Sequence, residues 1–244
     1  MNSASAGGGL TENAPGRYNA RMHIILFDID GTLVHTGGAG KAALQDALSV
    51  EFQVDAAHEV PVHGHTDRGI ARSLFRAHGL DDSQEHWDRF RTAYLRVLPD
   101  HLPRCTGRVL PGVTELLDLL SERDDVAVGL LTGNVQEGAR IKLGYYGLMH
   151  HFRFGGFGDV HYERNDVARE ALEVVRAFSN GRAAPERIWV IGDTPLDVSC
   201  ARHIGARCVA VVTGNHTLEE LTAAEPDLLL SDLSDPTSLL ERIG

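Results

Sequence analysis

The sequence predicts an α/β fold whose core is a doubly wound parallel sheet interrupted by an inserted α-helical domain. Two observations predict the sheet: the strand candidates are short apolar runs without polar alternation, and helical patterns separate them. Unbroken apolar runs are typical of parallel strands buried on both faces, and strands that alternate with helices wind into such a sheet. A third observation predicts the insert, because a long stretch after the first strand contains helical patterns alone. The expected core is Rossmann-like.

The strand candidates follow one another along the chain with helices between them. The first is the apolar run at residues 24–27, bounded by the turn-forming Gly31. Later apolar runs that end in small or polar residues lie at 126–134, 187–194, 207–215 and 227–232. Helical patterns lie at 111–123, 135–145, 166–178 and 195–204. The segment GGFGD at 155–159 lacks the spacing of a dinucleotide site, so we interpret it as a flexible loop.

The helical insert covers residues 37–104 and contains the amphipathic segments KAALQDALSVEF, DRGIARSLFRAH and EHWDRFRTAYLRVL. The prediction is therefore a flexible tail at 1–20, a core at 21–36 and 105–244, and this insert between the two core segments. The insert begins and ends close to Asp28 in the predicted topology. It should therefore cover the carboxyl ends of the strands, where ligands bind in open α/β sheets.

Composition excludes several classes of protein. The formal net charge of −11 argues against a nucleic-acid partner, because phosphate backbones attract basic surfaces. A small anionic substrate stays compatible with that charge, since a local cation can override the global sign. No stretch approaches the roughly 18 apolar residues of a membrane span, and the N-terminus has no apolar signal-peptide region. Three cysteines without a CxxC pair indicate free thiols, so we expect a cytoplasmic protein. The oligomeric state is not readable from the sequence.

Asp28 and Asp30 directly follow the first strand candidate and point to the same face, because strand side chains alternate. Asp193 and Asp197 follow another strand candidate. The carboxyl ends of parallel strands meet at one edge, so these four carboxylates should converge. Hard oxygen ligands of this kind suit Mg²⁺. Asp197 is also explained as a favourable charge at a helix N-terminus.

The segment Thr132-Gly133-Asn134 ends a third strand candidate and precedes a helix. A threonine hydroxyl and backbone amides at the start of a helix are good donors to phosphate oxygens. Thr132 and Asn134 are also typical of ordinary helix capping. Beside a metal-bound phosphoryl group, a carboxylate can attack phosphorus and form an aspartyl-phosphate.

The motifs FDIDGTL, LLTGN and IGDTPLDV, in this order, resemble motifs one, two and four of the haloacid dehalogenase-like (HAD) superfamily of phosphotransferases. The resemblance runs from about His23 onward and implies a C1-type cap at the position of the insert. It implies that Asp28 is the nucleophile and Asp30 the general acid and base. It also implies that Asp28, the Asp30 carbonyl and Asp193 hold Mg²⁺, with Asp197 orienting a metal-bound water. Thr132 would bind the phosphate.

Motif three departs from the family pattern, which places a lysine between motifs two and four. The chain has lysines only at positions 41 and 142. Lys142 lies too early for that role, so Arg164, just before a helix, is the predicted substitute cation. Arg169, further into the helix, is the weaker candidate.

The cap carries a loop, HEVPVHGHTDRG, that contains three histidines. Without cysteine or a further matched ligand we interpret the histidines as solvent-facing and not as a zinc site. Thr66 and Asp67 in this loop resemble the substrate-specificity loop of phosphoglycolate-phosphatase-like members. Asp67 is equally well explained as part of a helix N-cap.

The sequence therefore predicts a Mg²⁺-dependent phosphatase for a small phosphomonoester, with phosphoglycolate the substrate suggested by resemblance. A β-phosphoglucomutase-like phosphomutase shares all four motifs and stays open as an alternative. A non-catalytic binding module of the same fold is the third candidate. Asp30 disfavours a haloacid dehalogenase, which does not keep a second aspartate as general acid. A phosphonatase is disfavoured because Lys41 is the sole candidate for its cap lysine.

Overall fold

The computed structural model describes residues 22–55 and 60–243, so the predicted tail at 1–20 lies outside the described residues. Six parallel strands form the main sheet in the order β5-β4-β1-β6-β7-β8. Their bounds are β1 His23–Phe27, β4 Val126–Leu131, β5 Gly155–Gly156, β6 Ile188–Gly192, β7 Arg207–Val211 and β8 Leu228–Leu230. The predicted doubly wound parallel sheet is confirmed. Strand β1 lies at the centre of the sheet, with β4 and β5 on one side and β6, β7 and β8 on the other.

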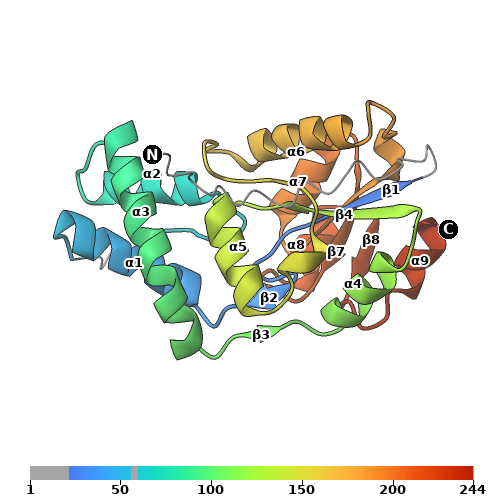
Figure 1. The fold of residues 1–244 in the computed structure, drawn as a ribbon, viewed down its shortest axis with the longest axis horizontal. Coiled ribbons are helices and arrows are strands. Elements are labelled where there is room, and N and C mark those ends of the chain that lie inside the picture. Colours follow the sequence, from blue (N-terminus) through green and yellow to red (C-terminus); the bar gives the residue numbers. More distant parts are fainter. Residues whose placement is uncertain (1–21, 56–59, 244) are drawn as a thin grey trace, which may run out of the picture.

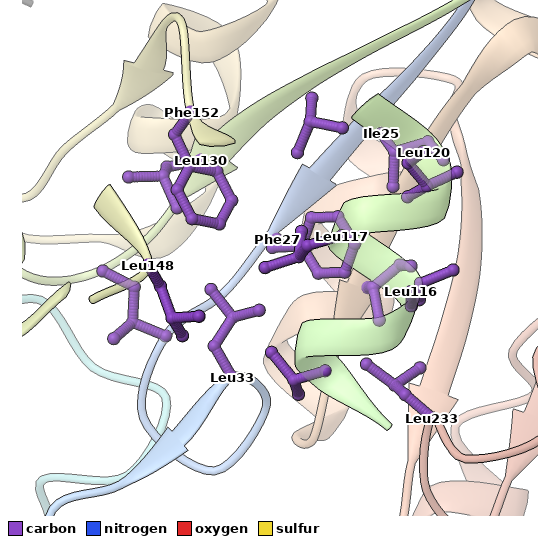
Figure 2. Packing of buried hydrophobic residues seen from close by; sticks show 14 of the residues in the cluster. Ile25, Phe27, Leu33, Leu116, Leu117, Leu120, Leu130, Leu148, Phe152 and Leu233 are labelled. Atoms are coloured by element: carbon purple, nitrogen blue, oxygen red, sulfur yellow. The ribbon is translucent and has the colours of Figure 1, made fainter. Parts of the chain in front are cut away.

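Both faces of the sheet are buried, which explains the unbroken apolar runs in the sequence. Ile25 and Phe27 belong to the hydrophobic cluster on one face, whereas Ile24 and Leu26 belong to the cluster on the other. Figure 2 shows the first cluster, where the leucines of one helix pack over β1. Since consecutive residues point to opposite faces, every position of a central strand must be apolar.

Helices cover the sheet on both sides (Figure 1). Those whose residues pack into the first cluster are α4 Val113–Ser121, α5 Gln136–Tyr145 and α9 Thr237–Ile243. Those of the second cluster are α6 Arg164–Phe178 and α7 Pro195–His203. The short helix α8 spans Leu218–Ala223, and single 3-10 turns lie at Leu102–Arg104, Met149–His151 and Pro185–Arg187.

The inserted helices form a separate layer beside the carboxyl ends of the strands (Figure 1). They are α1 Ala39–Phe52, α2 Asp67–Ala77 and α3 Gln84–His101, and all three fall within the predicted insert. Their amphipathic faces enclose a hydrophobic cluster of their own, which includes Leu48, Phe75 and Phe90. We call α1–α3 and the loop that joins α1 to α2 the cap.

Besides the short helices α8 and α9, two short strands were missed in the sequence. The antiparallel pair β2 Val34–His35 and β3 Arg108–Val109 joins the two connections between core and cap. Two-residue strands carry too little pattern to be predicted.

The interpretation of 155–159 as a flexible loop was wrong, because Gly155 and Gly156 form the edge strand β5. A Cβ at Gly155 would lie 2.9 Å from the Cβ of Leu130, and one at Gly156 would lie 2.7 Å from the Cβ of Ala171. These glycines are therefore needed for close packing, and they removed the apolar signal of a strand.

Among the described residues, no helix has the length and apolar character needed to cross a membrane.

Candidate active site

Neighbouring strands bring the predicted carboxylates together. β1 pairs with β6, so Asp28, directly after β1, and Asp193, directly after β6, come out side by side. Asp197 lies in the first turn of α7. One carboxylate oxygen from each of these three residues lies within 4.8 Å of the others, and all three side chains are buried. Three of the four carboxylates expected to converge therefore do so, whereas the Asp30 side chain is not part of this group.

Arg164 supplies the positive charge of this cluster. It begins α6, and its side chain is 4% exposed. Its Nη1 donates a hydrogen bond to Asp28 Oδ1 at 3.2 Å, and its Nη2 forms an ion pair with Asp197 Oδ1. Arg169, the weaker candidate, instead pairs with Asp166 at the surface. The structure thus places the predicted motif-three substitute beside the predicted nucleophile.

The charges in this acid-rich cluster, which we define as Asp28, Asp193, Asp197 and Arg164, do not balance. Burial raises the pKa of Asp28 to about 6, against the lowering effect of Arg164. Burial raises the pKa of Asp193 well above its ordinary value, and the charges of Asp197 and Asp28 raise it further. Three carboxylates share one guanidinium, so the ionised cluster is unfavourable without another cation.

A divalent metal ion fits this donor set. Its ligands would be hard carboxylate oxygens, which suit Mg²⁺ better than softer metals. Gly31 has φ of +94°, and a Cβ there would collide with the Asp193 carboxylate. A Cβ at Gly214 would also collide with the same carboxylate. The backbone of these two glycines therefore packs directly against the Asp193 carboxylate. The absence of a side chain at both positions leaves room for that carboxylate within the cluster.

Asp197 also has the structural role that its position allowed. Thr194 and Asp197 form a capping box at the start of α7: the Asp197 carboxylate accepts hydrogen bonds from the Thr194 amide at 3.1 Å and hydroxyl at 2.7 Å. Its other oxygen pairs with Arg164. The side chain is fully buried. Asp197 thus fixes the start of α7 and the position of Arg164 together.

The loop Thr132-Gly133-Asn134 follows β4, as predicted. Thr132 is fully buried, and its hydroxyl oxygen accepts hydrogen bonds from the Asn134 amide and side chain at 3.3 and 2.9 Å. The next two amides along the chain bind carboxylates: Val135 donates to Asp67 at 2.8 Å, and Gln136 donates to Asp159 at 2.7 Å. Gly133 and Asn134 line the cavity described below.

The cap loop that carries Thr66 and Asp67 docks on this core loop. Thr66 caps α2 by accepting a hydrogen bond from the Gly69 amide, and its hydroxyl donates to the Tyr162 carbonyl at 3.1 Å. The Asp67 amide donates to the Gly133 carbonyl at 2.7 Å. Burial raises the pKa of Asp67 to about 6. Thr66 is fully buried, and Asp67 reaches the cavity.

A cavity of about 500 Å³ lies between the cap and the strand ends. Its core side carries Asp28, Asp30 and Arg164. Its cap side is partly apolar, with Leu44, Val60, Val62 and Ile70, and also carries Lys41, His63 and Tyr94. A phosphate ester could therefore meet Asp28 while the rest of the molecule contacts the cap.

Lys142 is the site residue that sequence reasoning missed, because it was considered only as the motif-three lysine and set aside for that role. It lies too far from motif three to act as its lysine, yet it is buried in α5 with its Nζ 2.6 Å from Asp30 Oδ2. The spacing from Asn134 to Lys142 is eight residues, about two helical turns, and was a usable signal. Asn134 lies just before α5 and Lys142 lies in its last turn, and the two side chains meet along one side of the helix.

Comparison with known proteins gives a family match over most of the chain. The model of the family described as haloacid dehalogenase-like hydrolase matches residues 25–211. A phosphoglycolate phosphatase of Synechococcus elongatus is 30% identical over 214 residues, covering 88% of this chain and 95% of the relative. A probable phosphatase, IndB, of Dickeya dadantii is 28% identical, covering 87% and 90%.

Solved structures share the fold. The crystal structure of CbbY from Rhodobacter sphaeroides in complex with phosphate superposes with a TM-score of 0.70 at 19% identity, covering 88% of this chain and 96% of that one. At this identity the likeness establishes the architecture alone.

Proposed function

The chain belongs to the haloacid dehalogenase-like hydrolases, and from this premise we propose that it is a phosphatase that hydrolyses a small phosphomonoester through an aspartyl-phosphate. The observation that carries the proposal is the arrangement of Asp28, which contacts Arg164 within the acid-rich cluster and faces the cavity. Relatives named as phosphatases match along nearly their whole length, which supports the same class of reaction.

The two steps use the two aspartates in different roles. Asp28 attacks phosphorus, so a bond forms between its carboxylate oxygen and phosphorus while the bond to the leaving oxygen breaks. Asp30 donates a proton to that leaving oxygen. Asp30 then takes a proton from water, which attacks phosphorus and releases phosphate from Asp28. Arg164 offsets negative charge on Asp28 and on the transferred group.

We propose Mg²⁺ as the cofactor, held by Asp28, the Asp30 carbonyl and Asp193, with Asp197 beside it. The excess of buried carboxylates supports this, since one arginine leaves the cluster negative. The ion, when bound, neutralises charge on the phosphoryl oxygens. Phosphate oxygens would contact Gly133, Asn134 and Thr132 at the end of β4.

The cap restricts the substrate to small molecules in this proposal. The Asp67 amide donates to the Gly133 carbonyl, and both residues line the cavity, so this contact joins cap and core at its wall. Closure limits bulk water around the leaving group during the first step. We also propose a cytoplasmic location, which agrees with three cysteines that are not disulfide-bonded.

Hydrolysis of para-nitrophenyl phosphate by the purified protein tests this function. We expect turnover with Mg²⁺, loss of turnover with EDTA, and at least a thousandfold lower rate in Asp28→Asn, about 4 kcal/mol of activation free energy. Activity that survives Asp28→Asn would contradict the nucleophile. Inactivity of the wild type on this ester and on a panel that starts with phosphoglycolate would favour the non-catalytic module. Turnover that depends on a sugar bisphosphate activator would favour the phosphomutase.

A further inference from the structure

Lys142 forms a compact three-residue contact with Asp30 and Asn134, which we call the lysine triad. Lys142 Nζ lies 2.6 Å from Asp30 Oδ2 and donates to Asn134 Oδ1, also at 2.6 Å. Asn134 Nδ2 donates to the same Asp30 oxygen at 2.9 Å. The triad therefore closes on itself, with each member in contact with the other two.

The two oxygens of Asp30 have different surroundings. Oδ2 accepts both hydrogen bonds, from the ammonium and from the amide. Oδ1 accepts none from the part of the chain that the structure describes, while the Asp30 side chain is 39% exposed and lines the cavity. Two donors on one oxygen fix the rotation of the carboxylate and leave the other oxygen available to a reacting group.

Lys142 itself is firmly placed. Its side chain is 5% exposed, and it extends from the buried side of α5. Helix α1 of the cap approaches it so closely that a Cβ at Gly40 would lie 3.2 Å from Nζ. A buried amine needs polar partners, because an unpaired polar group is costly to bury. In this chain those partners are Asp30 and Asn134.

We propose that Lys142 is a positioning residue for proton transfer, which holds Asp30 so that Oδ1 meets the leaving oxygen and then the attacking water. This inference rests on the proposed phosphatase function and assigns a role that the motif pattern does not give. Lys142 acts through Asp30 and leaves contact with the phosphoryl group to Arg164 on the other side of Asp28.

The dependence on the leaving group tests this role. Para-nitrophenolate departs readily without a proton, whereas the alkoxide of an alkyl phosphate requires one. The specificity constant kcat/KM reports the steps up to departure of the leaving group. We expect Lys142→Met to lower kcat/KM about 10- to 100-fold for phosphoglycolate, or for the best alkyl phosphate in the panel, the range seen when a supporting hydrogen bond is lost. For para-nitrophenyl phosphate we expect a loss under about threefold.

A double-mutant cycle separates positioning from general damage to the site. If Lys142 acts through Asp30, Lys142→Met has no further effect in an Asp30→Asn background. Lys142→Gln, which keeps a donor but not the charge, should lose less activity than Lys142→Met. The matched control is Arg140→Met, because Arg140 lies in the same helix and pairs with Glu137 at the surface. This control should behave as wild type.

The outcomes are distinct. Equal losses on both substrates, or losses that add in the Asp30→Asn background, would overturn the inference and indicate direct substrate contact or structural damage. If the wild type is active and Lys142→Met has the same activity on both substrates, the inference is also overturned. A wild type inactive on every substrate would overturn the proposed function itself.

Discussion

The acid-rich cluster and the lysine triad lie on either side of the same strand end, yet their charges are arranged in opposite ways. In the cluster three buried carboxylates share Arg164. In the triad a single carboxylate meets the single buried amine of Lys142, and Asn134 bonds to both, while Asp30 Oδ1 accepts no hydrogen bond from the described residues. Asp28 and Asp30 are two residues apart but belong to different electrostatic environments.

This difference teaches which part of the site needs a cation from outside the protein. Burial, and then repulsion from Asp197 and Asp28, raises the pKa of Asp193, so we infer that this region is stabilised by further positive charge. In the triad the one carboxylate has a lysine and an amide as hydrogen-bond partners. We therefore propose the metal beside Asp28, whereas the side chain of Asp30, the proposed proton-transfer group, is held by Lys142 and Asn134.

Removing the one cation of the cluster should have the largest effect. Arg164→Ala leaves three buried carboxylates without the cation of the cluster, which typically costs about 3–5 kcal/mol of folding free energy. Its contact with Asp28 is also lost, so we expect turnover to fall about a thousandfold, as for loss of a charge that stabilises a phosphoryl transition state. Chemical denaturation and steady-state kinetics with para-nitrophenyl phosphate measure the two effects.

The control for this change is Arg169→Ala. Arg169 lies in the same helix, but its side chain is 64% exposed and pairs with Asp166 at the surface. Its removal should change stability by less than about 0.5 kcal/mol. Near-normal activity of Arg164→Ala would exclude Arg164 as the motif-three cation.

The sequence predicted the acid-rich cluster better than the triad, for a physical reason. Asp28 and Asp193 follow central parallel strands, and topology alone brings such strand ends together. Arg164 could be chosen because it begins the helix that follows the expected position of motif three. Asp30 follows β1, whereas Lys142 lies in α5. The two meet only because the lysine side chain extends from this helix to the end of β1. No strand pairing predicts such a contact.

The cap shows the same limit. Its three helices were predicted from amphipathic patterns, because a buried face leaves a periodic signal. The docking of Asp67 on the Val135 amide and the Gly133 carbonyl, just before α5, depends on how the cap lies against the core. Sequence patterns describe one helix face at a time, so they could not distinguish a substrate contact from a docking contact for Thr66 and Asp67.

Asp67 has a third arrangement. Its buried carboxylate accepts a hydrogen bond from the Val135 amide but forms no ion pair among the described residues. Burial raises its pKa to about 6 in the folded state, against 3.8 for the ordinary group. Between these values the unfolded chain has released the proton and the folded chain has not, so stability falls as pH rises from about 4 to about 6. The cost of ionisation above that window is about 3 kcal/mol.

Asp67→Asn removes this cost and keeps an oxygen for the Val135 amide. We expect the variant to match the wild type near pH 4 and to be more stable by up to about 3 kcal/mol at pH 7. Urea unfolding at both pH values measures the difference. Asp159→Asn is the control, because Asp159 binds the next amide of α5 but is 30% exposed, so its gain should be smaller. A gain that does not depend on pH would refute the assignment.

The smallest expected effect comes from changing one aspartate to asparagine in the acid-rich cluster and one in the lysine triad, which compares the two directly. Without metal, Asp193→Asn relieves repulsion in the cluster, while asparagine still accepts the Thr32 hydroxyl hydrogen bond. We expect its Tm to rise by about 3 °C, equivalent to about 1 kcal/mol. Asp30→Asn instead leaves the Lys142 ammonium without its carboxylate, so its Tm should fall by a similar amount.

Adding Mg²⁺ should raise the Tm of the wild type and of Asp30→Asn, but raise that of Asp193→Asn much less, because binding to the folded state stabilises it by mass action. Tm shifts of the same sign in Asp193→Asn and Asp30→Asn would mean that the cluster and the triad do not differ in charge balance. The proposed place of the metal would then be wrong.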